Sequence, residues 1–397
     1  MADIAFREDA LSAPRILRRR SCVISGARWD FRVDSELNAY DRASQFAIFA
    51  PPQSPEWVEA WVEAGSELVI PRIHASDGSC VLALALETTR RRGLRIARFV
   101  GNRHSNANFP MCSYSAIERI KPELLQALFE AISALRPDID LLTFERMSWA
   151  RAGKRNPFAE IEHRPSADIT LATDLSAGFD AVVARTGGSS KLKKYRRQVR
   201  KFNETGDVRI FTATTPAEIE RILNEFLTMK AQRFAAQGIA DPFAPDTVQL
   251  AFRKLFRDAP HGQIKLFTLD AIEIGGKIRA IAGHSHDGDR LICDFCAFSN
   301  DELSAHSPGS FLFFETIRKA AEQGYRIYDF SVGDEPYKRH WADIETELFD
   351  VVVPLNMKGR IAATGLQASY SAKRWLKSQP RLWDQAKRMR KLLRGKK

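Results

Sequence analysis

The feature that most constrains the fold of this 397-residue sequence is a run of three consecutive strands with no helix between them. Each segment alternates apolar and polar residues, and the turns Gly275-Gly276 and Asp287-Gly288 separate them, as in β-hairpins. The pattern predicts strands at Gln263–Ile272, Lys277–His286 and Asp289–Phe298. These three strands should lie side by side in an antiparallel sheet.

Two helices precede this meander. A predicted strand, Asp207–Thr214, is followed by a capping box, Thr215 to Glu218, which begins a helix that runs to Gly238. A second helix is predicted at Pro245–Ala259. The meander is therefore attached to a strand and a helix pair.

A helix and a returning strand follow the meander. The predicted elements are a helix, Gly309–Gln323, a strand, Tyr325–Phe330, a short polar helix near Asp334–Trp341, and a last strand, Glu347–Val353. The strand–helix–strand unit should be a right-handed crossover between parallel strands. The order β-α-α-β-β-β-α-β-α-β thus predicts a mixed sheet that can open between its two central strands.

Two motifs narrow this pattern. They are Ser307-Pro308-Gly309-Ser310, at a predicted helix start, and Asp329-Phe330-x-x-Gly333-Asp334-Glu335-Pro336-Tyr337-Lys338-x-x-Trp341. In this strand order they resemble the GNAT acyltransferase superfamily, and within it the FemAB-like and CelD-like bacterial group. The resemblance implies acyl-CoA as co-substrate, with its pantetheine arm in the gap between the central strands. The longer Arg/Gln-x-x-Gly-x-Gly/Ala run that GNAT proteins usually carry is not found here.

Members of this group often contain two related GNAT-like halves. The fold class that we predict is α/β (α+β), with two GNAT-like domains whose mixed, mainly antiparallel sheets are flanked by helices. The expected divisions are an irregular lead-in at 1–27, a first domain at 28–165, a second at 166–355 and a basic tail at 356–397. In the first domain we expect a helix at Pro55–Gly65 and a long loop, Arg91–Cys112, whose polar part, Asn102–Pro110, is placed to cover an acceptor.

The positive charge gathers at the end of the chain. From Asn356 to Lys397 there are thirteen Lys or Arg and one acid, while the rest is close to neutral. An amphipathic basic helix around Leu382–Leu393 would lie on anionic lipid or pack on its own protein. No window approaches the ~18 apolar residues of a membrane span, so we expect a cytoplasmic protein, with the tail as a contact to the inner face of the membrane.

A second basic segment, Lys191–Lys201, has seven Lys or Arg in eleven positions and follows a glycine-rich hinge. Its cationic face suits a 3′-phosphate, a lipid head group or tRNA, or is a solvated interdomain helix. DNA is not an expected partner, because no DNA-reading motif accompanies the charge. No metal site is predicted: Cys293 and Cys296 should point to opposite faces of a strand.

Acyl transfer to an amine needs a base and a proton donor for the leaving thiolate. The hairpin register predicts His284 opposite Leu291 and His286 opposite Asp289, with Asp294 on the face away from His284. The candidate catalytic residues are His284 or Asp329 as base and Tyr337 as acid. His286, Asp334 and Glu335 are candidates for binding the acceptor.

Donor phosphates are expected at the helix start, because its first N–H groups lack helical partners. The candidate donor-binding residues are Ser307, Pro308, Gly309, Ser310 and Lys338. Gly309 would let a phosphate come close. An ordinary capped helix explains the same residues without a ligand.

The leading hypothesis is an acyl-CoA-dependent N-acyltransferase acting on an amine of an envelope component, an amino sugar or a sphingoid-like lipid base. The alternatives are aminoacyl-tRNA-dependent transfer to a peptidoglycan precursor and a non-catalytic scaffold in exopolysaccharide assembly.

Overall fold

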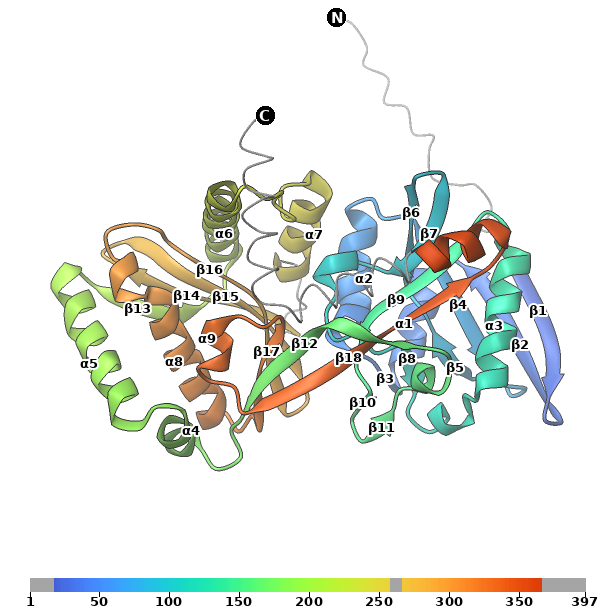
Figure 1. Ribbon diagram of the computed structural model, residues 1–397, viewed down its shortest axis with the longest axis horizontal. Helices are drawn as coiled ribbons and strands as arrows, with labels where there is room; N and C mark the ends of the chain where they lie inside the picture. Colours follow the sequence, from blue (N-terminus) through green and yellow to red (C-terminus); the bar gives the residue numbers. More distant parts are fainter. Residues whose placement is uncertain (1–17, 258–265, 366–397) are drawn as a thin grey trace, which may run out of the picture.

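The computed structural model describes residues 18–257 and 266–365, which are built around one long sheet (Figure 1). The first half begins with a strand, β1, where we had expected an irregular lead-in. Its elements are β1 (Arg18–Ile24), β2 (Ala27–Asp34), α1 (Leu37–Ser44), β3 (Ala47–Ile48), η1 (Pro51–Gln53), α2 (Pro55–Glu63), β4 (Leu68–His74), β5 (Cys80–Ala83), β6 (Leu86–Arg91), β7 (Leu94–Phe99), η2 (Asn102–His104), β8 (Met111–Ser113), η3 (Ile117–Arg119), α3 (Pro122–Leu135), β9 (Leu141–Met147), β10 (Ala150–Arg151), β11 (Lys154–Arg155) and η4 (Pro157–Glu160).

The second half follows the predicted order. Its elements are β12 (Arg164–Asp174), α4 (Phe179–Thr186), α5 (Gly188–Thr205), β13 (Val208–Thr212), α6 (Pro216–Gln237), α7 (Asp246–Arg257), β14 (Phe267–Ile274), β15 (Lys277–Asp287), β16 (Arg290–Phe298), η5 (Ser304–His306), α8 (Pro308–Glu322), β17 (Ile327–Val332), α9 (Pro336–Arg339) and β18 (Ile344–Pro354). From β13 to β18 this is the series read from the sequence. The capping box of Thr215 and Glu218 is present at the start of α6.

The strands form the order β13-β14-β15-β16-β17-β12-β18-β9-β7-β6-β4-β5-β8-β3. At its centre, β12 and β18 run between the two halves (Figure 1), and β18 pairs with both β12 and β9. On either side of this central pair lies one parallel pair, β16 with β17 and β7 with β9. The prediction of a mixed, mainly antiparallel α/β fold is therefore confirmed, and the halves share one sheet.

The expected loop from Arg91 to Cys112 is wrong, because β7 lies within it and pairs with β6. The basic helix predicted around Leu382–Leu393 falls outside the described residues. None of the helices in the described part of the chain combines the length and apolar character that a membrane span requires.

The predicted register of the β15–β16 hairpin is also wrong. Asp287 pairs with Arg290, so the loop is Gly288-Asp289, and His286 faces Leu291. A bulge follows, because Gly283 pairs with Phe295 whereas His284 pairs with Cys293. One extra residue on β16 thus shifts every partner beyond it.

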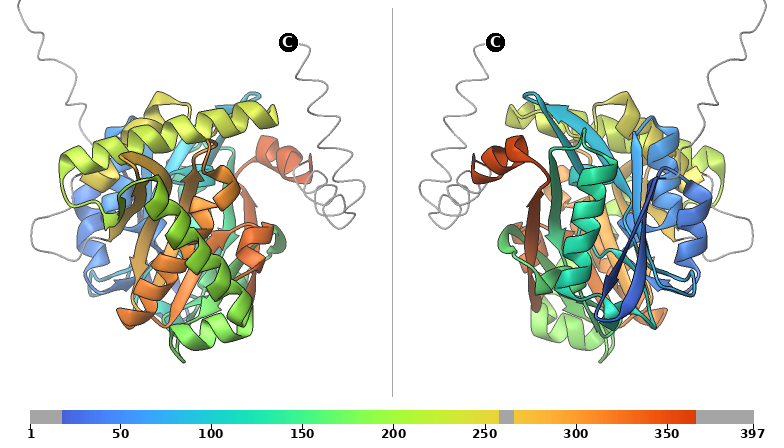
Figure 2. Two further views of the ribbon diagram at one scale, coloured as in Figure 1. Left: turned by 90° about the vertical axis from the view of Figure 1, so that its left-hand side faces the viewer. Right: turned by 90° about the vertical axis from the view of Figure 1, so that its right-hand side faces the viewer.

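The bulge also corrects the expected orientation of the two cysteines. Cys293 and Cys296 both belong to the core beneath α8, because the bulged Asp294 and Phe295 are turned toward the other face. On the α8 side, α5 lies diagonally across the second half (Figure 2).

The opposite face carries a core shared between the halves. It includes Trp57 and Trp61 of α2, Phe226 of α6 and Phe252 of α7. This shared core fixes the first half against the face of the sheet that bears Asp294.

Candidate active site

A pocket opens where the parallel strands β16 and β17 separate. Their pairing ends at Ile292 with Asp329. Beyond it lies a cavity of about 570 Å³, here called the gap pocket, bounded by the end of β16, the start of α8 and α9. Its lining includes Phe298, Phe313, Tyr337, His340 and Trp341.

The motif Ser307-Pro308-Gly309-Ser310 lies at the gap pocket and begins α8, as predicted. The carbonyl of Ser307 accepts hydrogen bonds from the N–H groups of Ser310 (3.0 Å) and Phe311 (3.3 Å). A Cβ on Gly309 would come within 2.2 Å of the Phe298 ring. The glycine is therefore required by the packing of Phe298, a reason that the sequence did not reveal.

Helix α5 closes the same end of the gap pocket. Lys194 donates from Nζ to Ser310 Oγ (3.2 Å), and Gln198 Nε2 donates to the carbonyls of His306 (2.7 Å) and Ser307 (3.1 Å). Sequence reasoning did not assign Lys194 to this site, because more than a hundred residues separate it from Ser310. A lysine thus stands at this end of the pocket, here called its mouth.

Lys191 lies behind this mouth and is buried. Its Nζ donates to Thr186 Oγ1 (2.7 Å) and to the carbonyl of His340 (3.2 Å), and sits 3.2 Å from the centre of the Trp341 ring. Burial lowers the pKa of Lys191 to about 7, and the charge of Lys194 adds to the effect. Its charge at neutral pH is therefore only partial.

Tyr337 reaches into the gap. Its hydroxyl lies 3.5 Å from Cys296 Sγ on the opposite strand, and its ring stacks on Phe313 with centroids 5.3 Å apart. Burial, with a smaller effect from Cys296, raises the pKa of Tyr337 above its ordinary value. The hydroxyl therefore stays protonated at neutral pH and can donate a hydrogen bond into the gap pocket.

Three other residues of the same segment hold the turn itself. Lys338 is buried and donates from Nζ to the carbonyl of Val332 (2.7 Å) and to Glu335 (2.9 Å). Asp334 is exposed and pairs with Arg339. The structure therefore engages Lys338, Asp334 and Glu335 within the β17–α9 turn, and none of them lines the gap pocket.

His284 is fully buried on the α8 side of the sheet. Its Nδ1 lies 2.8 Å from Asp270 Oδ2 and its Nε2 lies 2.8 Å from the hydroxyl of Tyr328, which in turn lies 3.1 Å from Thr316 Oγ1. Burial acts to raise the pKa of Asp270, but the hydrogen bond and charge of His284, together with Lys319 and Thr212, lower it overall. His284 thus belongs to a buried polar chain and does not line the gap pocket.

His286 lies at the end of the same strand. It contacts the hydroxyl of Tyr325 (2.6 Å) and Thr268 Oγ1 (3.0 Å). Burial, and then the neighbouring His284, lower the pKa of His286 to about 4. It is neutral at pH 7, lies near His284 and does not line the gap pocket.

Asp329 is buried at the point where β16 and β17 separate. Its Oδ2 accepts from Arg290 Nη1 (2.7 Å), and its Oδ1 accepts from the N–H of Ser331 (2.7 Å). The predicted free base is therefore a carboxylate paired with an arginine. Asp329 nevertheless lies at the last residue pair before β16 and β17 separate.

Asp294 is the residue that sequence reasoning passed over. It occupies the bulge of β16 and is half-buried, on the face away from His284. Burial raises the pKa of Asp294 to about 7, opposed by a hydrogen bond with Ser285 and increased by the charge of Asp329. A carboxyl group with this pKa exchanges protons near neutrality.

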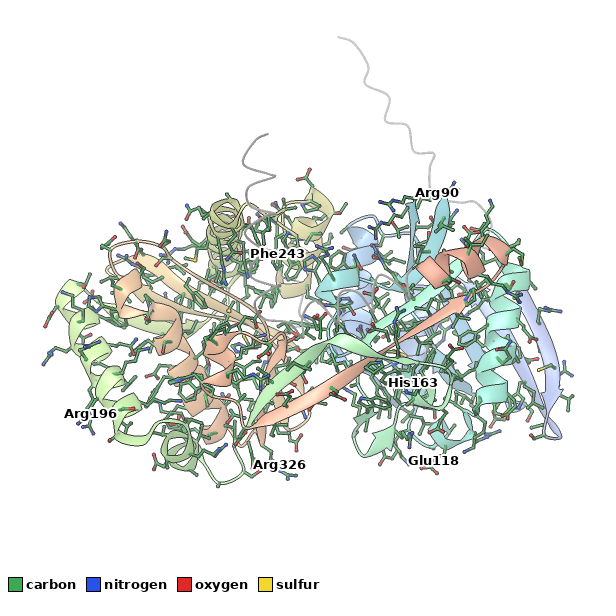
Figure 3. All side chains as sticks on the ribbon, in the orientation of Figure 1. Arg90, Glu118, His163, Arg196, Phe243 and Arg326 are labelled. Atoms are coloured by element: carbon green, nitrogen blue, oxygen red, sulfur yellow. The ribbon has the colours of Figure 1, made fainter. Side chains whose placement is uncertain are left out.

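Asp294 lines a second cavity, here called the interdomain pocket, of about 170 Å³. Aromatic side chains surround it, with Phe243 lying between the halves (Figure 3). They are Trp57, Phe243, Phe252, Phe256, Phe267 and Phe295. Arg103, His104 and Asn106 are also part of the lining. Aromatic walls and one carboxyl group suit an ammonium group attached to an apolar body, which the carboxyl group would hold against the charge of Arg103.

The polar loop of the first half forms one wall of the interdomain pocket, through Arg103 and Asn106. Arg146 holds this loop, because its guanidinium donates to the carbonyls of Asn102 (2.9 Å) and Arg103 (3.1 Å) and to Asn106 Oδ1 (2.6 Å). The loop Asn102–Pro110 therefore borders the interdomain pocket. That it covers an acceptor stays a prediction.

In the first half, polar side chains fill the position that corresponds to the gap pocket. Between β7 and β9, Gln53 Nε2 donates to Asn108 Oδ1 (2.7 Å), and Asn108 Nδ2 donates to the carbonyl of Glu145 (2.8 Å). The N–H of Phe109 donates back to Gln53 Oε1 (3.1 Å). The two halves are thus related in topology but differ at this position.

Within residues 18–257 and 266–365, no three His, Cys, Asp or Glu side chains are grouped so that they could hold a metal ion.

Comparison with known proteins agrees with this geometry. Residues 189–339 match a family described as an acetyltransferase (GNAT) domain. The search of curated proteins gave no match. Among solved structures, FemX is similar with a TM-score of 0.52 and 12% identity, over 80% of this chain and 96% of FemX.

Two further structures are similar at lower scores. The C-terminal domain of a putative lysylphosphatidylglycerol synthetase from Agrobacterium fabrum has a TM-score of 0.48 and 14% identity, over 85% of this chain and 96% of that domain. A tandem GNAT protein from the clavulanic acid biosynthesis pathway has a TM-score of 0.43 and 13% identity, over 81% of this chain and 94% of that protein. Residues 189–339 thus match the GNAT acetyltransferase family, and the fold is similar to that of FemX.

Proposed function

We propose that the protein transfers an acyl group from a thioester in the gap pocket to an amine that enters through the interdomain pocket. The observation that carries this proposal is the arrangement of β16. Phe298 lines the gap pocket and Asp294, four residues earlier, lines the interdomain pocket. Donor and acceptor would therefore approach the same strand from two cavities.

Asp294 is the proposed base. Its carboxylate takes a proton from the ammonium group of the acceptor, and the free amine then attacks the thioester carbon. Its pKa of about 7 leaves a substantial ionised fraction at neutral pH. We assign His284 a structural role instead, because both of its ring nitrogens are engaged in the buried chain.

Tyr337 is the proposed acid. When the carbon–sulfur bond breaks, the thiolate takes the hydroxyl proton of Tyr337, and the nitrogen gives up its second proton, which returns to Tyr337 through water. The oxyanion formed before this step would be stabilised by a backbone N–H at the bulge, where β16 departs from regular pairing. The products are an amide and a free thiol.

For the donor we propose a thioester of the acyl-CoA type, with its phosphate near Ser307–Ser310 and Lys194. For the acceptor we propose an amine of an envelope component, an amino sugar or a sphingoid-like lipid base. The aromatic lining of the interdomain pocket supports an acceptor with an apolar part beside its amine. The basic C-terminal sequence favours a place near a membrane.

The test is thioester consumption with release of free thiol, across acyl lengths and amines. Asp294→Asn should lower turnover by about 100-fold or more, the scale of general base catalysis. Asp289→Asn, in the exposed loop next to β16, is the matched control and should leave turnover unchanged. Absence of turnover with every thioester and amine would contradict the proposal.

A second candidate, which follows from the resemblance to FemAB-like proteins, is aminoacyl transfer from tRNA. One observation favours it: α5 exposes a row of Lys and Arg beside the gap pocket. It predicts consumption of an aminoacyl ester and no use of acyl-CoA. Charge reversal on α5 should then abolish tRNA binding.

A further inference from the structure

We infer that the acyl donor is delivered by an acidic carrier protein, which docks on α5 and inserts a phosphopantetheine-linked acyl group into the gap pocket. This inference rests on the proposed use of a thioester. It adds the partner that presents the thioester and the surface that receives it.

The docking surface is one face of α5, here called the α5 surface. Along this helix of 18 residues, about 27 Å long, five basic side chains are exposed: Lys193, Lys194, Arg196, Arg197 and Arg200. Among the described residues, the ion pairs of α5 are limited to Lys201 with Glu204, at 3.6 Å. The positive charge of the α5 surface is thus left for a partner.

The inner face of α5 is firmly packed, so the α5 surface has a fixed orientation. The Tyr195 ring stacks on Phe314 and Phe311 of α8, with centroids 4.0 Å and 5.1 Å apart. Gln198 and Phe202 are buried on the same side. A partner would therefore meet a preformed row of cations.

The α5 surface adjoins the mouth of the gap pocket. Lys194 belongs to both, because it lines the pocket and its Nζ contacts Ser310 at the start of α8. Figure 2 shows α5 lying across the outer side of the second half. A protein bound on this helix would hold a flexible arm close to the pocket opening.

The helix start is better suited to one phosphate than to a diphosphate. The first two N–H groups after Gly309, those of Ser310 and Phe311, already bond to the Ser307 carbonyl. The Phe298 ring covers Gly309, so no glycine-lined cradle is open there. Lys194 and Ser310 can contact the single phosphate of a carrier-bound arm, whereas coenzyme A brings a diphosphate and a further phosphate.

The α5 surface favours an acidic protein over RNA. Proteins that bind single-stranded RNA ends usually stack the bases on exposed aromatic rings. The aromatic residues of α5, Tyr195 and Phe202, pack inward instead. A single row of cations on one helix complements an acidic helix of a small protein.

The experiment compares one acyl group on three carriers: a holo-acyl carrier protein, coenzyme A and pantetheine. We expect kcat/KM with the carrier protein to exceed that with acyl-CoA by about 10-fold or more, and to fall as salt is raised. The double variant Arg196→Glu/Arg200→Glu should lower the carrier-protein value by about 10-fold or more. Its activity with acyl-pantetheine should not change.

A matched control carries the same charge change at a distant site. Arg90→Glu/Arg91→Glu lies at the exposed β6–β7 turn of the first half, and Figure 3 shows Arg90 and Arg196 at opposite ends of the molecule. This variant should use the carrier protein as the unmodified protein does. Equal loss in both variants would overturn the inference, because it would indicate a nonspecific charge effect.

The remaining outcomes separate this inference from the proposed function. Turnover of acyl-CoA with no gain from the carrier protein overturns the carrier and leaves the proposed function standing. Binding of tRNA that depends on Arg196 and Arg200, without carrier binding, overturns it in favour of RNA. Calorimetric binding of the holo-carrier protein, lost in the α5 variant, supports docking even where no thioester is consumed.

Discussion

Arg290 and Asp329 form an ion pair across the parallel strands β16 and β17, with Nη1 and Oδ2 2.7 Å apart, just before the strands separate. Asp294 lies four residues further along β16, and the charge of Asp329 raises its pKa. Arg290 offsets part of that charge. Burial is the larger cause of the raised pKa of Asp294, so the pair adjusts the pH at which the proposed base ionises and does not set it alone.

Neutralising Arg290 and neutralising Asp329 should shift the pH dependence of kcat in opposite directions. Arg290→Gln exposes the charge of Asp329, so the rise in kcat, expected near pH 7, should move to higher pH. Asp329→Asn removes the charge, and the rise should move to lower pH. Profiles of kcat from pH 5 to 9 check both shifts; loss of the rise in Asp329→Asn, with a low rate throughout, would instead make Asp329 the base.

Asp294→Asn should stabilise the protein at high pH while it abolishes activity. The pKa of Asp294 is raised from 3.8 to about 7, so between these values the folded state binds more protons, and stability falls as pH rises. Asparagine does not ionise, so the variant avoids this loss of stability. We expect its free energy of unfolding at pH 8.5 to be ~1–3 kcal/mol higher, after allowance for the partial exposure of the side chain. Urea unfolding at pH 8.5 and at pH 4 measures it; an equal difference at both would contradict the assignment.

His284→Ala should affect stability far more than the chemical step. The change removes one partner of the buried Asp270, which keeps only Thr212 and Lys319, and we expect this to cost roughly 3–5 kcal/mol. Because His284 lines neither pocket, the folded fraction should retain turnover. Urea titration with kcat per folded molecule separates the effects, and an undestabilised variant with about 100-fold lower kcat would restore His284 as the base.

The element order was predictable because its signals are local. The capping box of Thr215 and Glu218 and the Gly275-Gly276 turn each specify a boundary from adjacent residues. The start of α8 at Ser307–Gly309 was found in the same way. These features place the gap pocket correctly along the chain.

The proposed base was missed because its cavity depends on contacts between the halves. The predicted register already put Asp294 on the face away from His284, as the structure has it. The bulge in β16, which only the partner strand reveals, turns Phe295 to the same face, where a Cβ on Gly283 would lie within 2.1 Å of its ring. The cavity beside Asp294 is completed by Trp57 of the first half, a contact that the sequence does not reveal.

Contacts between segments far apart in the sequence could not be predicted either. Lys194 meets Ser310 only because α5 packs on α8, and β18 pairs with β9 only because the halves share one sheet. Periodicity specifies which face of a helix is apolar, but not which neighbour covers it. The basic segment was recognised, while its position at the gap pocket was not.

Gly309→Ala should impair donor binding through Phe298. The added methyl group would lie about 2.2 Å from the Phe298 ring, which lines the gap pocket, so the ring must move into the space of the donor. We expect a loss of about 1–3 kcal/mol in stability, as for other overpacked sites, and a higher KM for the thioester with little change in kcat.

A double-mutant cycle tests whether Phe298 transmits the effect of Gly309→Ala. With Phe298→Ala already in place there is no ring to displace, so adding Gly309→Ala should cost less than about 0.5 kcal/mol, the scale of additive sites. The cycle is measured by urea unfolding and by the KM for the thioester. If Gly309→Ala raised KM equally in both backgrounds, the glycine would instead be needed for direct approach of the donor phosphate, as the sequence had first suggested.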